Sequence, residues 1–154
     1  MKNVKLSPAN IVILAAGAVM LIASFLGFYK LDIPVEHLGG GVTVGGSTSY
    51  NAWSSGQFLI ATLPAFIGMA MAGQIALVAF GGVSPPEKPL GLTWDQVHLV
   101  LGFQAALMML AFLIRSKPTN SFGIGFWLML LSGIALFVGA VMRTSEAGRK
   151  PRAV

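Results

Sequence analysis

Four long apolar runs set the pattern of hydrophobic and polar positions along the chain, and none contains an Asp, Glu, Lys or Arg. They are Ile11–Tyr29, Gln57–Phe80, Val97–Ile114 and Ser121–Met142. A helix needs about 20 such residues to cross a hydrocarbon core about 30 Å thick. The pattern therefore predicts an all-α membrane protein, in which one bundle of four transmembrane helices takes up the single domain of residues 1–154.

The segment between the first two runs, Lys30–Ser55, predicts a small β-hairpin outside the membrane. Val42–Val44 is rich in β-branched residues and Ser47–Tyr50 is polar, and the Gly45-Gly46 pair between them suits a turn that requires positive φ. Leu31–Ile33 is a further candidate strand. The alternative for the same segment is a disordered loop rich in glycine and serine.

The helix boundaries carry local signals of their own. Ser7 followed by Pro8 is typical of an N-cap and a first helical position, and Thr93 is a candidate N-cap for the third helix. Pro64 lies about two turns into the second run, where proline removes a backbone hydrogen bond, so we expect a kink there. We expect the nearby Thr62 hydroxyl to satisfy the carbonyl group that Pro64 leaves free.

Both ends of the chain are basic and polar. Met1–Lys5 and the small residues of Ala16–Ala18 resemble parts of a secretory signal peptide. The apolar run continues past them through Phe28, however, which favours an uncleaved first helix. Residues 144–154 are predicted to form a flexible basic tail.

The distribution of Lys and Arg predicts how the chain is oriented. The net charge is +5, from 10 Lys and Arg against 5 Asp and Glu. With both termini cytoplasmic, the inner side holds Lys2, Lys5, Lys88, Arg143, Arg149, Lys150 and Arg152, and the outer side holds Lys30, Arg115 and Lys117. This excess predicts that both termini lie inside and that the Gly-rich first loop faces outward.

Composition excludes several classes of function. Hydrophobic residues make up 55% of the chain, and no basic patch is interleaved with aromatic residues, so we expect membrane lipids and no nucleic acid as partners. The absence of cysteine excludes disulfides, thiolate metal sites and a cysteine nucleophile. No nucleophile–base pair, metal-spaced cluster or phosphate-binding loop is present in the sequence. We therefore predict no enzyme, no catalytic residue, no metal and no cofactor; His37 and His98 fall on opposite sides of the membrane by this topology.

Small residues recur at four-residue spacing in the apolar runs, which lets neighbouring helix backbones approach closely. The positions that we expect to mediate helix packing are Gly68, Ala72, Ala76, Ala135 and Gly139. Packing within one chain is the simpler interpretation. The alternative is a face for a homo-oligomer or for a membrane-protein partner.

Two amides, Gln74 and Gln104, fall well inside the second and third runs. A buried amide in hydrocarbon needs hydrogen-bond partners, because an unsatisfied polar group costs several kcal/mol there. We expect the two amides to bond to each other or to Ser24 or Ser132, which would form a polar cross-link inside the bundle. The alternative is that they contact a ligand.

Three short motifs resemble those of a group of small bacterial membrane proteins that are common in actinobacteria. Phe25–Tyr29 reads FLGFY, Asn51–Trp53 reads NAW, and Gly123–Leu128 reads GIGFWL, against the group's F-L-P-W/F-Y, N/S-A-W and G-x-G-x-W-L. Gly27 replaces the expected proline. The resemblance implies four helices in a bacterial plasma membrane, and it implies no activity.

These features favour a non-enzymatic structural or accessory subunit that binds a partner protein or lipid. The expected contact patch on the outer loop consists of Tyr50, Asn51 and Trp53. The alternative is a small-molecule or lipid carrier, in which Gln74 and Gln104 line a polar path through the bundle.

Overall fold

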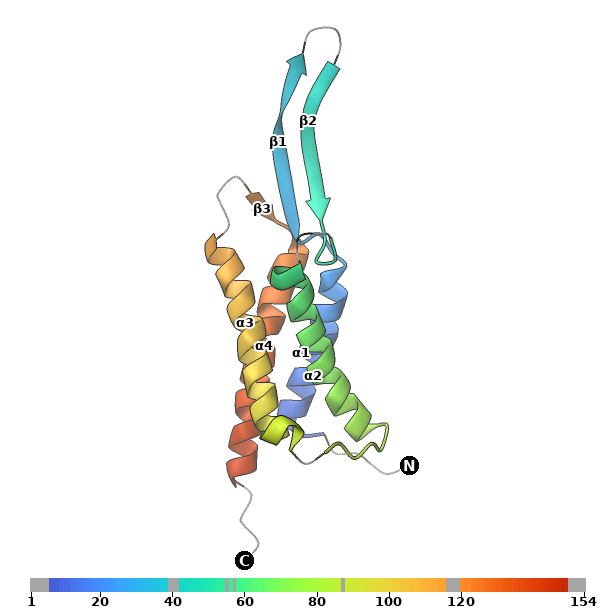
Figure 1. Ribbon diagram of the computed structural model, residues 1–154, viewed down its shortest axis with the longest axis vertical. Coiled ribbons are helices and arrows are strands. Elements are labelled where there is room, and N and C mark those ends of the chain that lie inside the picture. The colour runs from blue at the N-terminus through green and yellow to red at the C-terminus, as the bar shows by residue number, and fades with distance from the viewer. Residues whose placement is uncertain are drawn as a thin grey trace, which may run out of the picture.

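Four helices stand side by side in the computed structural model, and a β-hairpin extends from one end of them (Figure 1). The structure describes residues 6–38, 42–54, 56, 58–86, 88–115 and 120–149. The main elements are α1 (Pro8–Ser24), β1 (Tyr29–Leu38), β2 (Val42–Tyr50), a π-helical turn (Phe58–Thr62), α2 (Leu63–Ala79), α3 (Trp94–Arg115), β3 (Asn120–Phe122) and α4 (Ile124–Arg149). The start of α1 and the end of α4 lie at the end of the bundle opposite the hairpin.

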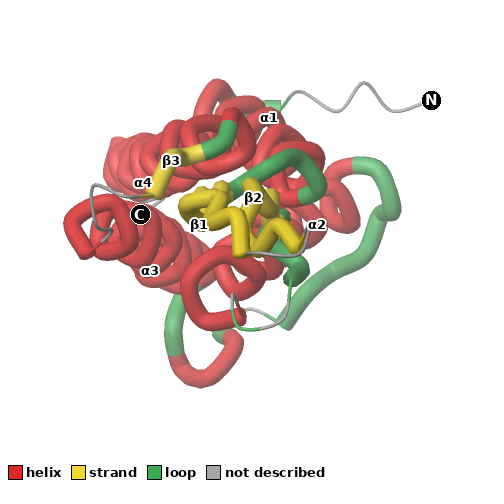
Figure 2. Tube along the Cα trace, turned by 90° about the horizontal axis from the view of Figure 1, so that it is seen from above, coloured by secondary structure: helices red, strands yellow, loops and turns green. Residues whose placement is uncertain are grey.

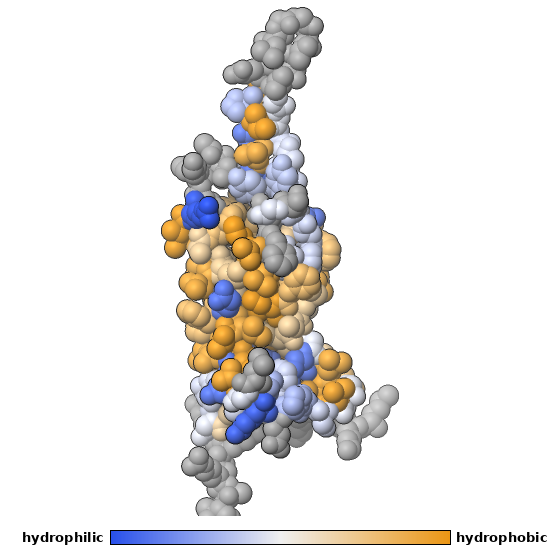
Figure 3. All heavy atoms as spheres, in the orientation of Figure 1, coloured by the Kyte–Doolittle hydropathy of each residue, from blue (hydrophilic) through white to orange (hydrophobic). Residues whose placement is uncertain are grey.

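The helices are apolar on their outer faces as well as between them. Large apolar residues that are more than half exposed include Ile22, Leu77, Ile114 and Leu131. Figure 3 shows the resulting broad hydrophobic band between two more polar ends. Three helical segments, Leu59–Ala79, Trp94–Arg115 and Ile124–Gly148, are long and apolar enough to cross a membrane, whereas α1 has 17 residues.

Neighbouring helices pack against each other with their backbones close together. α1 packs against both α2 and α4, and α3 packs against α4 and α2 (Figure 2). A Cβ atom on Gly17 would lie 2.6 Å from Ala72 Cβ and 2.7 Å from the carbonyl oxygen of Gly68, so only glycine fits where α1 meets α2. A Cβ atom on Gly139 would likewise lie 2.7 Å from Ile13 Cγ1, where α4 meets α1.

α1 ends at Ser24, so the helix predicted to reach Tyr29 stops earlier. Phe28 lies in the connection that follows and is fully buried. Its ring centroid is 5.2 Å from that of Phe112 and 5.4 Å from that of Phe126. The apolar run continues beyond the helix because a loop residue fills the top of the core.

The hairpin in the first loop is longer than expected, and its predicted turn is wrong. Gly45 and Gly46 lie within β2, where Gly46 pairs with Ile33 of β1. Gly45 has a φ of 125°, and a Cβ atom there would collide with the carbonyl oxygen of Pro34. The strand predicted over Leu31–Ile33 is part of β1, which continues past Pro34 with a register shift between Ile33 and Glu36. The connection between β1 and β2 lies outside the described residues.

A third strand, which the sequence did not predict, pairs with the base of the hairpin. β3 lies antiparallel to the first residues of β1, and Tyr29 pairs with Phe122. The strand order is therefore β2-β1-β3. Because β3 leads directly into α4, this pairing joins the hairpin to the last helix as well as to α1.

The role predicted for Thr62 is wrong. A π-helical turn leads directly into α2, so Pro64 lies near the start of a continuous helical segment, Leu59–Ala79, where π-helical geometry changes to α-helical. The Thr62 hydroxyl donates instead to the carbonyl oxygen of Ala52 at 2.5 Å. The side chain therefore ties the start of α2 to the loop that follows the hairpin.

The predicted N-caps are confirmed. Ser7 Oγ accepts a hydrogen bond from the Asn10 backbone N–H at 3.3 Å, with Pro8 at the helix start. Thr93 and Gln96 form a reciprocal pair: the Thr93 N–H donates to Gln96 Oε1 at 2.9 Å, and the Gln96 N–H donates to Thr93 Oγ1 at 3.4 Å.

α4 continues to Arg149, so the tail predicted to be flexible from residue 144 is helical over its first part. The hydroxyl groups of Thr144 and Ser145 donate to the Val141 carbonyl oxygen, which lets these polar residues remain in the helix. Residues 150–154 lie outside the described part of the chain.

Candidate functional site

Trp53 joins the base of the hairpin to the end of α1. Its indole N–H donates to Ser24 Oγ at 2.9 Å, and Ser24 Oγ donates in turn to the Leu21 carbonyl oxygen. Its ring stacks on Phe25 with centroids 5.6 Å apart and meets the Phe66 ring edge-on at 5.4 Å. The ring therefore links α1, α2 and the loop after β2.

The other two residues of the expected contact patch are also engaged within the chain. Asn51 Oδ1 accepts hydrogen bonds from the Trp53 backbone N–H at 3.0 Å and from Ser54 Oγ at 3.1 Å. The Tyr50 ring lies beside that of Tyr29 across the strand pair, with centroids 6.4 Å apart. All three patch residues are partly buried. They hold the hairpin on the bundle, and most of the hairpin extends beyond them.

Replacing Trp53 by phenylalanine is expected to lower the free energy of unfolding by about 1 kcal/mol, because it removes the hydrogen bond to buried Ser24 and keeps the ring contacts. Trp127→Phe is the matched control, since the Trp127 indole N–H bonds to no described residue. Thermal unfolding in detergent should rank Trp53→Phe below the control. Equal stability of the two variants would show that the Ser24 contact contributes nothing.

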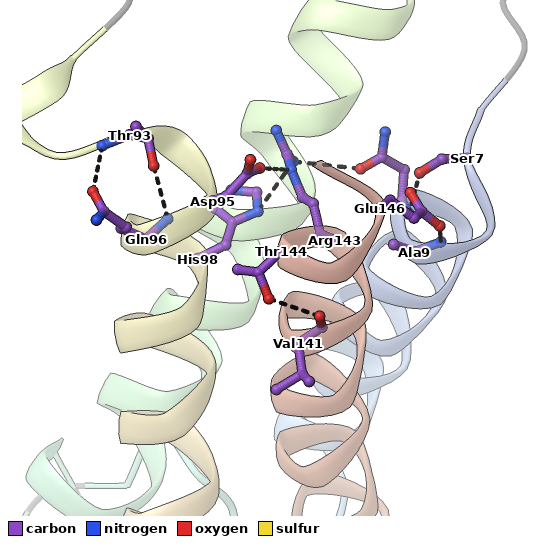
Figure 4. A network of polar contacts seen from close by, with 11 residues as sticks. Ser7, Ala9, Thr93, Asp95, Gln96, His98, Val141, Arg143, Thr144 and Glu146 are labelled. Carbon is purple, nitrogen blue, oxygen red and sulfur yellow. Dashed lines mark hydrogen bonds and ion pairs between the residues drawn. The ribbon is translucent and has the colours of Figure 1, made fainter. Parts of the chain in front are cut away.

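The opposite end of the bundle holds a polar cluster centred on Arg143 of α4 (Figure 4). Arg143 Nε lies 2.5 Å from Asp95 Oδ1, in an ion pair whose side chains are only 21% and 29% exposed. Arg143 Nη1 lies 3.4 Å from Asn10 Oδ1. One guanidinium therefore links the start of α3, the end of α4 and the start of α1.

His98 is the fully buried member of this cluster, at 1% exposure. Its Nδ1 lies 3.2 Å from Arg143 Nη1. Because a guanidinium only donates hydrogen bonds, Nδ1 accepts and the ring proton is carried by Nε2. Nε2 is buried and has no hydrogen-bond partner among the described residues. The cluster therefore contains one buried donor for which the described residues offer no acceptor.

The sequence contains a signal for this cluster at two helix ends. Asp95 and His98 are three residues apart, so they share one face at the start of α3, and Arg143 is the first charged residue after the last apolar run. In adjacent antiparallel helices, such ends meet at the same level. A basic residue at the end of one run and an acidic residue at the start of another therefore indicate an ion pair.

A cavity of about 240 Å³ lies beside Arg143. Its lining residues are Leu6, Asn10, Gln74, Ile75, Val78, Ala79 and Arg143. Gln74 Oε1 is buried and has no hydrogen-bond partner among the described residues. The expected bond between Gln74 and Gln104 is not formed, because Gln104 is exposed on the outer face of α3. The prediction that Gln104 is a buried amide is therefore wrong.

The small residues expected to mediate packing lie at several positions. Gly68 and Ala72 face Gly17, and Gly139 faces α1, as described above. Ala135 is partly buried against the core of the bundle. The Ala76 carbonyl oxygen accepts a hydrogen bond at 2.8 Å from the backbone N–H of Phe80, the residue that follows α2.

The chain matches no known family model, and no curated protein matches it significantly. In the described part of the chain, no three His, Cys, Asp or Glu side chains lie together as a group that could hold a metal ion. Any functional assignment therefore depends on the hairpin and on the cluster around Arg143.

Proposed function

We propose that this protein is a non-enzymatic accessory subunit of a bacterial plasma membrane. In this proposal all four helices cross the membrane, both termini are cytoplasmic, and the hairpin binds a protein partner outside. The charge-free apolar runs, the Lys and Arg distribution and the resemblance to small actinobacterial membrane proteins support the location. The side-by-side arrangement of α1 with the three longer helices supports the four spans.

The observation that carries the partner-binding proposal is the exposed hairpin. β1 and β2 extend well beyond the bundle, and β3 pairs only with the first residues of β1 (Figure 1). Two-stranded ribbons are marginally stable alone in water. Ile33 is 50% exposed and Val35 is 55% exposed on this ribbon, and these apolar residues would be covered by a partner.

The outer edge of β2 favours a partner that adds a strand. β2 is the end strand of the sheet, and Val42–Tyr50 contains no charged residue and no proline. Proteins commonly protect an edge strand with charged side chains, proline or a bulge. The irregular point of β2 is at Gly45, so the regular part of the strand from Ser47 to Tyr50 remains as a template for pairing. An extended segment of a partner could form backbone hydrogen bonds along this edge.

The test is an affinity pull-down from native membranes in mild detergent, with mass spectrometry of the bound proteins. We expect the wild-type chain to recover a stoichiometric protein partner. The variant Ile33→Ser/Val35→Ser should weaken recovery about ten-fold or more, because each buried apolar side chain contributes over ~1 kcal/mol.

The matched control changes two apolar residues that are similarly exposed at the other end of the molecule, Val83→Ser/Leu92→Ser. It should recover the partner as the wild type does. Isolation of the wild-type chain without a stoichiometric protein partner would contradict the proposal, and so would equal recovery of the partner by both double variants. A carrier function finds no support in the two amides, because Gln104 does not line the cavity that Gln74 lines.

A further inference from the structure

Two polar side chains that line the cavity, those of Arg143 and Gln74, each have a group for which the described residues supply no hydrogen-bond partner. Arg143 directs Nε to Asp95 and Nη1 to Asn10 and His98, and no described residue accepts a hydrogen bond from its Nη2. Gln74 Oε1 is buried, and no residue in the described part of the chain donates a hydrogen bond to it. The Gln74 amide therefore leaves an acceptor for a hydrogen-bond donor of a ligand.

The other side of the cavity is apolar and leads outward. Ile75 is 3% exposed and Val78, one turn further along α2, is 42% exposed. The neighbouring Leu77 and Phe80 are 57% and 69% exposed. The cavity wall therefore runs from the interior of the bundle to its apolar outer surface, so a fitting ligand has a polar group and an apolar part.

This inference rests on the proposed membrane topology, which places the cavity at the level of the cytoplasmic lipid headgroups. The hydrophobic band in Figure 3 ends near this end of the bundle, where polar residues gather. Arg143 stands at the junction of α1, α3 and α4, as Figure 4 shows. Basic pockets between membrane helices at this depth are suited to phospholipid headgroups.

We propose that this cavity binds the headgroup of a membrane phospholipid whose phosphodiester is followed by a hydrogen-bond donor, an ammonium or a hydroxyl group. The phosphate oxygens accept from Arg143 Nη2, and the headgroup donor satisfies Gln74 Oε1. Asp95 already balances the charge of Arg143, so recognition depends on this pairing of acceptor and donor more than on net charge. The acyl chains lie along the exposed apolar end of α2.

The test is lipid titration of the purified full-length protein in detergent, read by native mass spectrometry. Phosphatidylethanolamine and phosphatidylglycerol carry a headgroup donor, and phosphatidylcholine does not. We expect both donor lipids to bind about ten-fold tighter than phosphatidylcholine, as one hydrogen bond to a buried amide predicts. Inorganic phosphate added in excess should not displace the bound lipid.

Two matched variants separate this site from a structural role. Gln74→Met removes the amide and keeps the length of the side chain, so the preference for donor lipids should disappear. Gln104→Met makes the same change on the exposed face of α3 and should retain the preference.

Three results would overturn the proposal. They are an unchanged preference in Gln74→Met, binding of phosphatidylglycerol alone, which would indicate attraction by charge, and displacement of the lipid by inorganic phosphate, which would indicate a site for a free anion. None of these readings depends on the hairpin, so the result is independent of partner binding.

Discussion

Replacing Gly17 by alanine is expected to destabilise the bundle by about 1–3 kcal/mol, the range typical of overpacked cores. The added methyl group would lie 2.6 Å from Ala72 Cβ and 2.7 Å from the Gly68 carbonyl oxygen. The second of these atoms belongs to a helix backbone, which cannot move aside as a flexible side chain would. α1 must therefore shift away from α2, and Gly17→Leu should shift it further.

The control is Gly73→Ala on the facing helix. A Cβ atom at Gly73 has nothing within 4 Å, so alanine there should raise stability by about 0.5–1 kcal/mol through its better helix propensity. Thermal or denaturant unfolding in detergent, followed by circular dichroism, measures both variants. The opposite signs are the critical result: Gly17→Ala that is as stable as Gly73→Ala would show that α1 and α2 are not in close contact.

Removing the Arg143 side chain is expected to have the second large effect. Arg143→Met should lower the free energy of unfolding by about 2 kcal/mol, between the values typical of exposed and of buried ion pairs, because the pair is only partly exposed. The change leaves Asp95 without its cation and His98 Nδ1 without its donor. Lysine at this position should rescue only in part, since it cannot reproduce the fork of donors.

A double-mutant cycle with Asp95→Asn isolates the interaction of the two side chains. We expect the double variant to be more stable than the sum of the two single changes predicts. Arg115→Met is the control, because Arg115 is exposed at the other end of α3 and forms no ion pair with a described residue. An additive cycle, or an equal loss in the control, would show that the Arg143 cluster does not hold the three helix ends together.

The apolar runs predicted the existence and order of the four helices but misplaced several ends. Hydropathy identifies Phe28 as apolar, but it does not show whether a helix or a loop buries the side chain. Phe28 fills the top of the core from a loop, so the run outlasts α1. The Gly45-Gly46 pair predicts a turn because glycine readily adopts positive φ. In the structure the same property serves the irregular point where β2 passes Pro34.

The sequence could not predict whether the Gln104 side chain points into the bundle or away from it. In a water-soluble helix, alternation of polar and apolar positions shows which side is buried. In these helices the outer surface is apolar too, so that pattern is missing and an amide gives no clue to its direction. The helix ends indicate the ion pair of Asp95 and Arg143, whereas the contact of Arg143 with Asn10 depends on how α1 meets α4 in the fold.

The central claim is that four spans place the hairpin on one side of the membrane and both termini on the other. The chain contains no cysteine, so single cysteines introduced at chosen positions report accessibility without background. The informative positions are Thr48 in β2, Ser145 near the end of α4, and Asn3, which precedes α1. With a membrane-impermeant maleimide, Thr48→Cys should be labelled in intact cells, whereas Ser145→Cys and Asn3→Cys should be labelled only after permeabilisation. Labelling of Asn3→Cys together with Thr48→Cys in intact cells would show that α1 does not cross the membrane and would contradict the account.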